Sequence, residues 1–394
     1  MGVSEKFYDV IIVGGGIVGL TLALLLQHSD KRIALLDKRG GVETFKPEQY
    51  DVRVSAITPA SHRLFEKLNV WESMAALRVS PFNQMEVWDG DGRIEFDAAS
   101  VGELTLGYIV ENNVMLQVLW QTVLCSKSID TITHLNLESL ERLEEKSMMA
   151  LHTDQGVFTA PLIIGADGAE SWLRQAAQIE LKTRDYQHHA LVCTVKTERP
   201  HHHTARQVFM PQGPLAFLPL AEPDLSSIVW SSNPTHIEKL MALPDVDFAS
   251  VLREAFQDRL GAILEVRPRA RFPLIRRHAK QYVQPGLALV GDAAHTIHPL
   301  AGQGLNLGLA DAALLAELIL SEYAHKQERV KYSTLRRYER ARKADNTQML
   351  VTMDGFRCLF GNDIPALKWL RQRGLNLTHR LPWVKEWIVQ QTIR

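Results

Sequence analysis

The sequence has few cysteines, almost no net charge and no long apolar run. Its three cysteines, Cys125, Cys193 and Cys358, lie far apart. They predict buried thiols in a reducing compartment rather than disulfides or a paired-thiol metal site. A formal net charge of −1 gives no electrostatic reason to expect nucleic acid as a partner. No uninterrupted apolar stretch reaches the roughly twenty residues of a membrane-spanning helix. Glycines break the N-terminal apolar run, which argues against a signal peptide and favours a cytoplasmic protein.

The sequence does contain enough apolar residues for a large globular protein. Hydrophobic residues make up 46% of its 394 positions, which fits two or more domains with sizeable cores. Residues 185–275 show the short, alternating apolar runs of antiparallel strands, whereas the flanking regions alternate strands with helices. In the antiparallel sheet, Phe209, Phe217, Leu218 and Trp230 are candidates to line a pocket, although core packing is the commoner role of such side chains.

The first motif with a chemical meaning lies at the N-terminus. A strand pattern over residues 9–13 is followed by G-x-G-x-x-G, a helix and a second strand that ends in an acid. In this context Gly14 allows a tight turn, Gly16 lets a pyrophosphate approach the backbone, and Gly19 lets helix and strand pack closely. Asp37 is placed to accept hydrogen bonds from an adenosine ribose with a free 2′-hydroxyl, as in FAD or NAD. The pattern therefore predicts a dinucleotide site.

Two later segments repeat the order of apolar strand, small residues, acid and helix. In the first, residues 162–174, Asp167 closes a buried strand, where it can face a ligand or cap the following helix. In the second, an apolar run over 287–290 leads into residues 291–308, with Asp292 near its start and a helix over 305–320. Its closely spaced glycines put no Cβ in the way of a ligand.

Arginine and histidine give weaker signals. Arg53 either pairs with a phosphate through its planar guanidinium or is an ordinary surface residue. The histidines at 188–189 and 201–203 lack cysteine or carboxylate partners at suitable spacing, so we expect surface loops there rather than a metal. His295 and His298 are three residues apart, but the adjacent Pro299 argues against a shared helix face. We therefore predict no metal site.

Residues 355–394 combine basic side chains with tryptophan and leucine at helical spacing. Such a composition suits an interfacial helix on an anionic membrane. The alternative is a C-terminal helix packed on the protein or on a partner chain. The first interpretation would make this a peripheral protein at the inner membrane.

Together these segments resemble the FAD-dependent aromatic hydroxylases related to p-hydroxybenzoate hydroxylase, and most closely those of ubiquinone biosynthesis. The similarity extends over nearly the whole chain. One departure is that related hydroxylases often have an arginine near Asn113, where this chain has none. The segments that carry the resemblance are 51–57, 85–89, 109–112, 165–174, 185–191 and 291–308.

The resemblance implies FAD as cofactor and NAD(P)H as co-substrate. Arg53 would contact a phosphate of FAD or the incoming nicotinamide nucleotide, and Asp167 with Gly168 would touch both nucleotides. Asp292 would bind the ribityl hydroxyls or a phosphate. No catalytic residue or general base is assigned; the flavin-facing loop would comprise Pro299, Gly302, Gln303 and Gly304. The implied FAD contacts are Gly14, Gly16, Gly19, Asp37, Arg53, Asp167, Gly168, Gly291, Asp292, Ala293, Pro299, Gly302, Gly304, Leu305 and Asn306.

The implied reaction is hydroxylation of the ring of a polyprenylated phenol or benzoquinol, with O2 activated as a flavin C4a-hydroperoxide. Segments 185–191 and 205–209 favour the 2-polyprenylphenol 6-hydroxylase type. Segments 96–99 and 276–308 are as similar to the demethoxyubiquinone (3-methyl-6-methoxy-benzoquinol) hydroxylase type. Two other functions stay open: a flavin-dependent prenyl reductase, and a non-catalytic FAD-binding subunit of a ubiquinone-biosynthesis complex.

The expected fold is an α/β, Rossmann-like FAD-binding domain with an inserted, mainly antiparallel β-sheet substrate domain and C-terminal helices. The FAD-binding domain would be formed from three stretches of chain, and the substrate domain from a hairpin and a larger sheet. The expected limits are 1–80, 104–182 and 278–350 for the FAD-binding domain, 81–103 and 183–277 for the substrate domain, and 351–394 for the helical tail.

Overall fold

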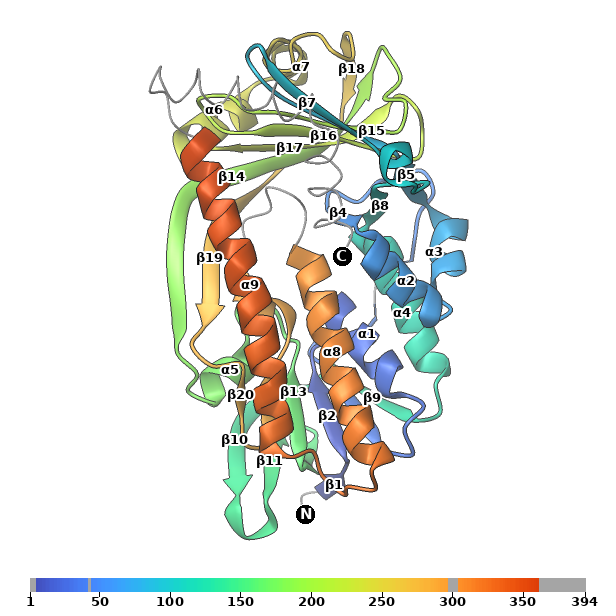
Figure 1. Ribbon diagram of the computed structural model, residues 1–394, viewed down its shortest axis with the longest axis vertical. Coiled ribbons are helices and arrows are strands. Elements are labelled where there is room, and N and C mark those ends of the chain that lie inside the picture. Colours follow the sequence, from blue (N-terminus) through green and yellow to red (C-terminus); the bar gives the residue numbers. More distant parts are fainter. Residues whose placement is uncertain (1–4, 42–43, 297–303, 361–394) are drawn as a thin grey trace.

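The structure, a computed structural model, describes residues 5–41, 44–296 and 304–360. A six-stranded sheet forms the centre of the lower part in Figure 1, and a nine-stranded sheet spans the upper part. The predicted α/β fold with a mainly antiparallel second sheet is thus confirmed. The domain limits given above remain a prediction.

The six-stranded sheet is parallel apart from its β20 edge. Three of its central strands read Val-Ile-Ile-Val, Leu-Ile-Ile-Gly and Leu-Ala-Leu and are buried along their whole length, as expected for parallel strands covered on both faces. In spatial order the strands are β20 (Val283–Gln284), β21 (Leu287–Leu289), β13 (Leu162–Gly165), β2 (Val10–Val13), β3 (Ile33–Asp37) and β9 (Ile129–Thr133).

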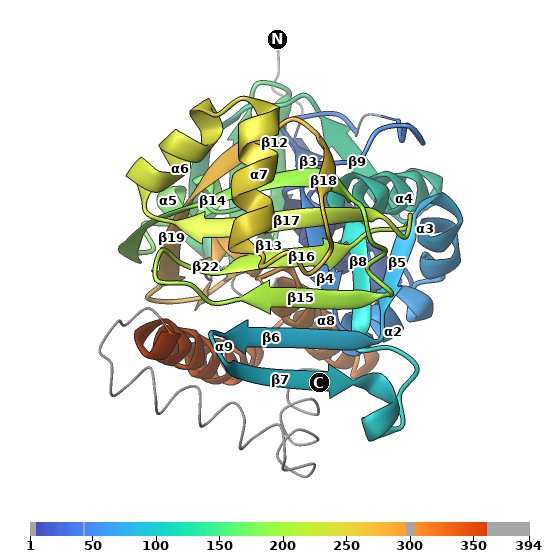
Figure 2. The same ribbon diagram turned by 90° about the horizontal axis from the view of Figure 1, so that it is seen from above.

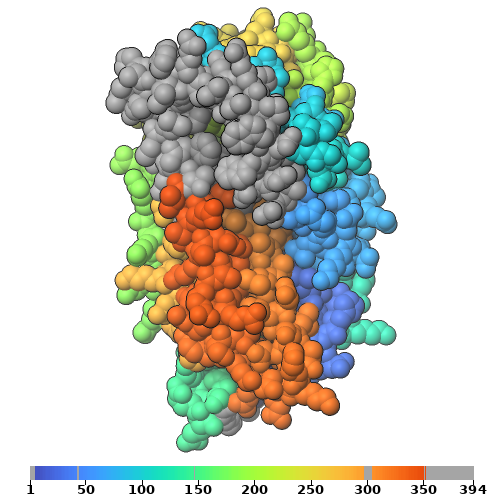
Figure 3. Space-filling view, viewed as in Figure 1, coloured from blue at the N-terminus to red at the C-terminus, as the bar shows by residue number. Residues whose placement is uncertain are grey.

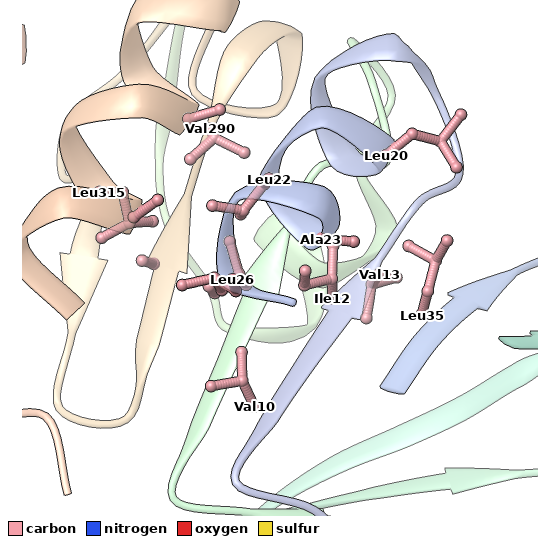
Figure 4. Close-up of a cluster of buried hydrophobic side chains, with 14 of the residues drawn as sticks. Val10, Ile12, Val13, Leu20, Leu22, Ala23, Leu26, Leu35, Val290 and Leu315 are labelled. Carbon is pink, nitrogen blue, oxygen red and sulfur yellow. The ribbon is translucent and has the colours of Figure 1, made fainter. Parts of the chain in front are cut away.

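Helices α1 (Ile17–Leu26), α4 (Asn112–Cys125) and α8 (Gly304–Ala324) pack together on this sheet. Figure 4 shows Leu22 of α1 and Leu315 of α8 directed into the same cluster as Val290. A four-stranded sheet also contacts β2 and β13. Its strands in order are β1 (Glu5–Phe7), β12 (Gly156–Ala160), β11 (Met148–Thr153) and β10 (Leu137–Leu143).

Helix α8 corrects one expectation from the sequence. By length and composition alone it is apolar enough to cross a membrane, although no such segment was expected. Half of its most apolar window is buried inside the protein, and Leu309, Ala312 and Leu315 belong to the main core. That burial is the environment of a core helix.

The nine-stranded sheet is antiparallel except where β15 pairs with β6. Helices α6 (Pro234–Ala242) and α7 (Asp245–Ala255) cover its outer face (Figure 2). Phe217 and Trp230 point to that face and join its core, so they do not line a pocket on the inner face. The strands are β22 (His295–Thr296), β19 (Ala270–Ala279), β14 (Leu181–Thr197), β17 (Leu225–Ser232), β16 (Leu215–Pro219), β15 (Thr204–Val208), β6 (Gln84–Asp89) and β7 (Gly92–Asp97), with β18 (Ile263–Val266) beside β14.

Strands β14 and β19 form a long ribbon that reaches from the nine-stranded sheet down beside the six-stranded one (Figure 1). Their pairing shifts register between Asp185 and His189, and Gln187 adopts φ +52° there. At the other edge of β19, Arg277 and His278 pair with Thr296 and His295 of β22. The segment that follows β21 is therefore hydrogen-bonded into the nine-stranded sheet.

The remaining elements fill the space between the two sheets and cover one side. Strand β8 (Gly107–Glu111) lies between β4 (Val54–Ile57) and β5 (Val79–Phe82). Helices α8 and α9 lie side by side on the face seen in Figure 3, in orange and red. Helix α9 comprises Tyr332–Phe360. The helices not yet mentioned are α2 (Pro59–Lys67), α3 (Trp71–Leu77) and α5 (Trp172–Ala176), and short 3-10 turns lie at Ala98–Val101, Glu144–Lys146 and Gly291–Ala293.

Three surface and burial expectations were wrong. His188 and His189, expected in a surface loop, lie half-buried in strand β14. Cys125 is exposed, whereas Cys193 is buried as expected. His201, expected in a surface loop, is 1% exposed. Its Nε2 lies 3.0 Å from the Leu220 carbonyl and 2.9 Å from the Glu222 carbonyl, and its Nδ1 accepts from the His203 amide. His201 therefore closes a loop. Within the described ranges, no three His, Cys, Asp or Glu side chains are grouped to hold a metal ion.

Candidate cofactor site

Three loops leave the carboxyl ends of neighbouring parallel strands. Val13 of β2, Gly165 of β13 and Leu289 of β21 are level in register. The Ala166 amide donates to the Val13 carbonyl (2.7 Å), and the Val290 amide donates to the Gly165 carbonyl (2.9 Å). Ligands of open α/β sheets bind beyond such ends. The sheet thus brings together the three segments that the sequence identified.

The N-terminal glycines have different environments. A Cβ on Gly14, whose φ is +112°, would lie 2.4 Å from the Ala166 carbonyl oxygen, and one on Gly19 would lie 1.9 Å from the Gly14 oxygen. A Cβ on Gly16 would meet nothing within 4 Å. Gly16 is also the N-cap of α1 and supplies no side-chain cap. Two glycines therefore allow close backbone packing, and the third leaves the N-terminus of α1 open to a ligand.

Asp37 stands at the end of β3, beside the N-terminal loop. Its Oδ2 accepts a hydrogen bond from the Gly15 amide at 2.6 Å, and its Oδ1 accepts one from the Arg39 amide at 2.7 Å. Two backbone donors thus fix the carboxylate while each oxygen keeps a second lone pair. This is the arrangement in which a carboxylate can also accept from ribose hydroxyls.

Asp167 lies in the loop after β13 with one oxygen satisfied and one not. Its Oδ2 accepts from the Leu173 amide at 3.0 Å, but the N-cap of α5 is Ser171. Its Oδ1 is buried and has no partner among the described residues. Burial raises the pKa of Asp167 despite hydrogen bonds from Ser171 and Leu173. Gly168, with φ +81°, follows it and faces open space.

Arg174 joins the second loop to the third and was missed by the sequence analysis. Its guanidinium donates to the Ala293 carbonyl and to the Ala169 carbonyl, each at 2.9 Å. The residue is 2% exposed, so these bonds are made away from water. An arginine three residues after Ser171, on the first turn of a short helix, was the available sequence signal.

Asp292 is the acid of the third loop. Its side chain is exposed, yet surrounding protein desolvates the carboxyl enough to raise its pKa, against the opposing charges of His295, Arg53 and Arg277. The residue is therefore accessible to solvent while neighbouring protein crowds its carboxyl group. Gly291, with φ +60°, forms the turn before it.

Arg53 is carried by a loop that a partly buried ion pair holds in place. Arg78 Nε donates to Glu111 Oε1 at 2.6 Å, and Glu111 Oε2 accepts from the Asp51 amide at 2.5 Å. Arg53 itself is exposed, and its charge acts to lower the pKa of Asp292. The structure therefore places Arg53 on the same side as the third loop. Arg78 and Glu111 were not identified from the sequence.

The start of α8 differs in part from expectation. Asn306, predicted to contact the cofactor, donates from Nδ2 to the Ala56 carbonyl (2.7 Å) and accepts at Oδ1 from the Thr58 amide (3.1 Å). Its amide thus joins α8 to β4 and α2. Leu305 is half-buried, and a Cβ on Gly304 would meet nothing within 4 Å. The predicted contacts Pro299, Gly302 and Gln303 lie outside the described residues.

An extended dinucleotide fits the described part of this site. The open N-terminus of α1 suits a phosphate, and Asp37 suits a ribose. Asp167 Oδ1 is an unsatisfied buried acceptor, and Asp292 is an exposed acid at the end of the neighbouring strand. Hydroxyl donors of a ligand would satisfy both. These features lie along the ends of adjacent strands, so one long ligand can reach them.

Comparisons with known proteins agree with this assignment. A family described as FAD binding domain matches residues 7–352. The 3-demethoxyubiquinol 3-hydroxylase of Escherichia coli (strain K12) is 38% identical, over 94% of this chain and 95% of the relative. The mitochondrial ubiquinone biosynthesis monooxygenase COQ6 of Xenopus tropicalis is 32% identical, over 97% and 92% of the two chains.

Among solved structures, p-nitrophenol 4-monooxygenase PnpA from Pseudomonas putida DLL-E4 has a TM-score of 0.80 at 17% identity, covering 98% of each chain. At that identity the likeness shows the fold. The family match and the sequence relatives show more, since both extend over most of the chain. The chain therefore belongs to the FAD binding domain family and, within it, to the FAD-dependent hydroxylases of ubiquinone biosynthesis.

Proposed function

We propose that the three loops form the FAD site in the way the motifs predict. Gly14, Gly16 and Gly19 shape the pyrophosphate end at α1, and Asp37 accepts from the adenosine ribose. Asp167 and Asp292 accept from hydroxyl groups further along the cofactor. The same proposal includes Arg53, Gly168, Gly291, Ala293, Gly304 and Leu305 as described residues beside FAD, and Asn306 as a residue that fixes the start of α8.

We propose that the substrate is a polyprenylated phenol or quinol whose ring is hydroxylated with NAD(P)H and O2. The observation that supports it is the inner face of the nine-stranded sheet, which lies above β4, β8 and the start of α8 (Figure 1). Cross-strand register puts Gln207 beside Ala216, Ala216 beside Val229, and Val229 beside Val192. One amide in an otherwise apolar row suits a ring with a polar substituent and an apolar tail.

FAD, when bound, supplies the redox chemistry that activates oxygen. The residues of the chain then have three tasks. The apolar row excludes water from the reacting ring. Gln207 orients the ring by hydrogen bonds to the oxygen substituents of the ring, and the three loops hold the cofactor. No described side chain is assigned as a general base for the phenol.

Two ring positions are candidates for hydroxylation. The segments 185–191 and 205–209 favour the 2-polyprenylphenol 6-hydroxylase type, which we retain as the first candidate. The 38% identity to a relative named 3-demethoxyubiquinol 3-hydroxylase favours the second. The deciding experiment deletes the protein in its own cell and identifies the accumulated quinone precursor. Accumulation of a 2-polyprenylphenol supports the first candidate, and accumulation of a demethoxyquinone supports the second. If neither compound accumulates, the proposed substrate class is contradicted.

Substrate-dependent oxygen uptake tests the reaction itself. Purified FAD-loaded protein should consume O2, NAD(P)H and the added phenol or quinol in equal amounts and form one equivalent of hydroxylated product. A prenyl reductase would oxidise NAD(P)H without O2, and a non-catalytic subunit would show no stimulation by substrate. The names of the relatives, a hydroxylase and a monooxygenase, favour the first outcome.

We predict that Gln207→Leu weakens substrate binding and coupling but leaves FAD in place. Loss of one hydrogen bond to the ring should raise KM or the fraction of NAD(P)H oxidised without product by about tenfold, corresponding to roughly 1–1.5 kcal/mol. The readouts are product formed per NAD(P)H and flavin content. A matched control is Gln84→Leu, because Gln84 is exposed and its amide donates to Asp97. Normal KM together with normal coupling in Gln207→Leu would contradict its proposed role.

We also propose that the basic and aromatic tail, residues 355–394, contacts an anionic membrane surface. Residues 361–394 lie outside the described residues, so the proposal depends on their composition. Deleting 361–394 should abolish co-sedimentation with vesicles of anionic phospholipid and leave FAD content unchanged. Vesicles of neutral phospholipid are the control. Equal binding of the shortened and full chains to anionic vesicles would refute membrane contact by the tail.

A further inference from the structure

Asp311 is a fully buried carboxylate on α8 with three strong hydrogen-bond donors around it. Its exposed fraction is 0%. Oδ2 accepts from the Gly291 amide at 3.0 Å and from His295 Nε2 at 2.6 Å, and Oδ1 accepts from Arg342 Nε at 2.6 Å. Burial alone would raise the pKa of Asp311, but the charges and hydrogen bonds of His295 and Arg342 outweigh it, so the pKa is lowered. The group is therefore an ionised acceptor.

Through these bonds one side chain contacts the third loop at two points, Gly291 and His295. Gly291 begins the turn that carries Asp292, and His295 begins β22. Because an ionised carboxylate can only accept, His295 Nε2 must carry the proton in this contact. Asp311 thus fixes the imidazole and the Gly291 amide at one oxygen, about two helical turns beyond the start of α8.

Arg342 on α9 balances the charge of Asp311. It is 6% exposed, and its other nitrogens donate to Asp345 Oδ2 (2.8 Å), Asn346 Oδ1 (3.2 Å) and the Leu307 carbonyl (3.3 Å). A buried carboxylate without such a partner would be strongly destabilising. Arg342 therefore serves the stability of the pair, while only Asp311 touches the third loop.

The third loop is thereby held on two sides, with Asp292 between the fixed points. Asp311 holds Gly291 and His295, and Arg174 holds the Ala293 carbonyl. Asp292 lies between these points as an exposed residue. When the backbone on both sides of a residue is anchored, the direction of its Cα–Cβ bond is fixed. Supporting residues preorganise a ligand contact in this way.

We propose that Asp311 is a positioning residue for FAD: through Gly291 and His295 it sets the direction in which Asp292 faces the cofactor. This inference depends on the proposed FAD site, in which Asp292 is a direct contact. Asp311 itself lies behind the loop and does not touch FAD. Its removal should therefore weaken FAD binding by more than the accompanying loss of stability explains.

The test compares three variants with the parent enzyme. Each protein is purified with FAD, and part of each preparation is then stripped of flavin to give the apoprotein. Asp311→Asn removes the charge and one acceptor at the loop. Arg342→Gln destabilises the same buried pair without touching the loop. Asp345→Asn removes the charge of an exposed partner of Arg342, since the Asp345 side chain is 61% exposed. For each variant, the FAD dissociation constant is measured by quenching of flavin fluorescence, the midpoint potential of the bound flavin by reductive titration, and the apoprotein Tm by thermal unfolding.

Asp311→Asn should raise the FAD dissociation constant at least about tenfold, as loss of a supporting contact does at other sites, and should shift the midpoint potential. Asp345→Asn should stay within about twofold. Arg342→Gln should lower Tm at least as far as Asp311→Asn with a smaller change in affinity. If Asp311→Asn and Arg342→Gln lose the same FAD affinity for the same fall in Tm, the positioning role is overturned and Asp311 has a structural role alone. If Asp311→Asn is insoluble, His295→Ala replaces it, and unchanged FAD affinity in that variant overturns the proposal.

Asp292→Ala separates this inference from the FAD site on which it depends. Tight FAD binding by Asp292→Ala would contradict the proposed site itself. Weakened binding by Asp292→Ala together with normal binding and potential in Asp311→Asn would contradict the positioning role alone.

Discussion

Gly16→Ala should weaken FAD binding in a protein of nearly normal stability, whereas Gly19→Ala should destabilise the fold itself. A methyl group on Gly16 meets nothing within 4 Å, and the backbone there has φ −77° and ψ 174°, which alanine readily adopts. The apoprotein should lose less than about 1 kcal/mol, the difference between glycine and alanine at an N-cap. The methyl group would occupy the space where a pyrophosphate approaches α1, so FAD affinity should fall about tenfold to a hundredfold.

Gly19→Ala has a different physical cause and a different readout. Its Cβ would lie 1.9 Å from the Gly14 carbonyl oxygen, and both atoms belong to packed backbone that cannot rotate away. We expect a loss of about 3 kcal/mol or more, seen as a lower apoprotein Tm and lower soluble yield. Thermal unfolding of the apoprotein and a fluorescence titration with FAD separate the two variants. Normal FAD binding by Gly16→Ala would contradict the proposed pyrophosphate site.

Arg174→Met should have the second large effect. Met fits the volume but leaves the Ala293 and Ala169 carbonyls without the donors that now lie 2.9 Å away. Each buried carbonyl left unpaired costs about 1–3 kcal/mol. Because the Ala293 carbonyl adjoins Asp292, FAD affinity should fall by about tenfold or more as Tm falls.

Arg174→Lys and Arg253→Ala define the cause of that loss. Lysine keeps the charge but lacks the planar fork that reaches two carbonyls, so an intermediate loss of affinity is expected. Arg253 forms an exposed pair with Asp258, and its removal should change neither Tm nor FAD affinity. Should Arg174→Met bind FAD as tightly as the parent protein, the bridge between the second and third loops would have no part in the site.

The sequence was most informative where local chemistry decides the structure. The fully apolar runs at β2 and β13 predicted buried parallel strands, and the glycine spacing predicted a loop whose packing requires Gly14 and Gly19. Both patterns can be recognised from residues that are close together in the sequence, although the Cβ of Gly14 would meet the distant Ala166. The type of enzyme also followed, because the motifs that carry the resemblance are themselves such local segments.

The missed residues are those whose partners are distant in the chain. Arg174 contacts a loop 119 positions away, and Asp311 meets Arg342 across two helices. An acid within the apolar first half of α8 was a usable signal for Asp311, since such a group must find partners when buried. The role of Asn306 was equally hidden, because its acceptor, Ala56, lies 250 positions earlier.

The β14–β19 ribbon bears on how a bulky substrate gains entry. The ladder continues for most of the 17 residues of β14, and β22 attaches the third cofactor loop to the same ribbon. A swing of the upper sheet away from FAD would rupture several ladder bonds or bend the ribbon at Gln187, where register already shifts. We therefore expect the upper sheet to move about the bulge at Gln187 when the ring enters. Cross-links between β14 and β19 on both sides of this bulge should hold the two sheets at a fixed separation.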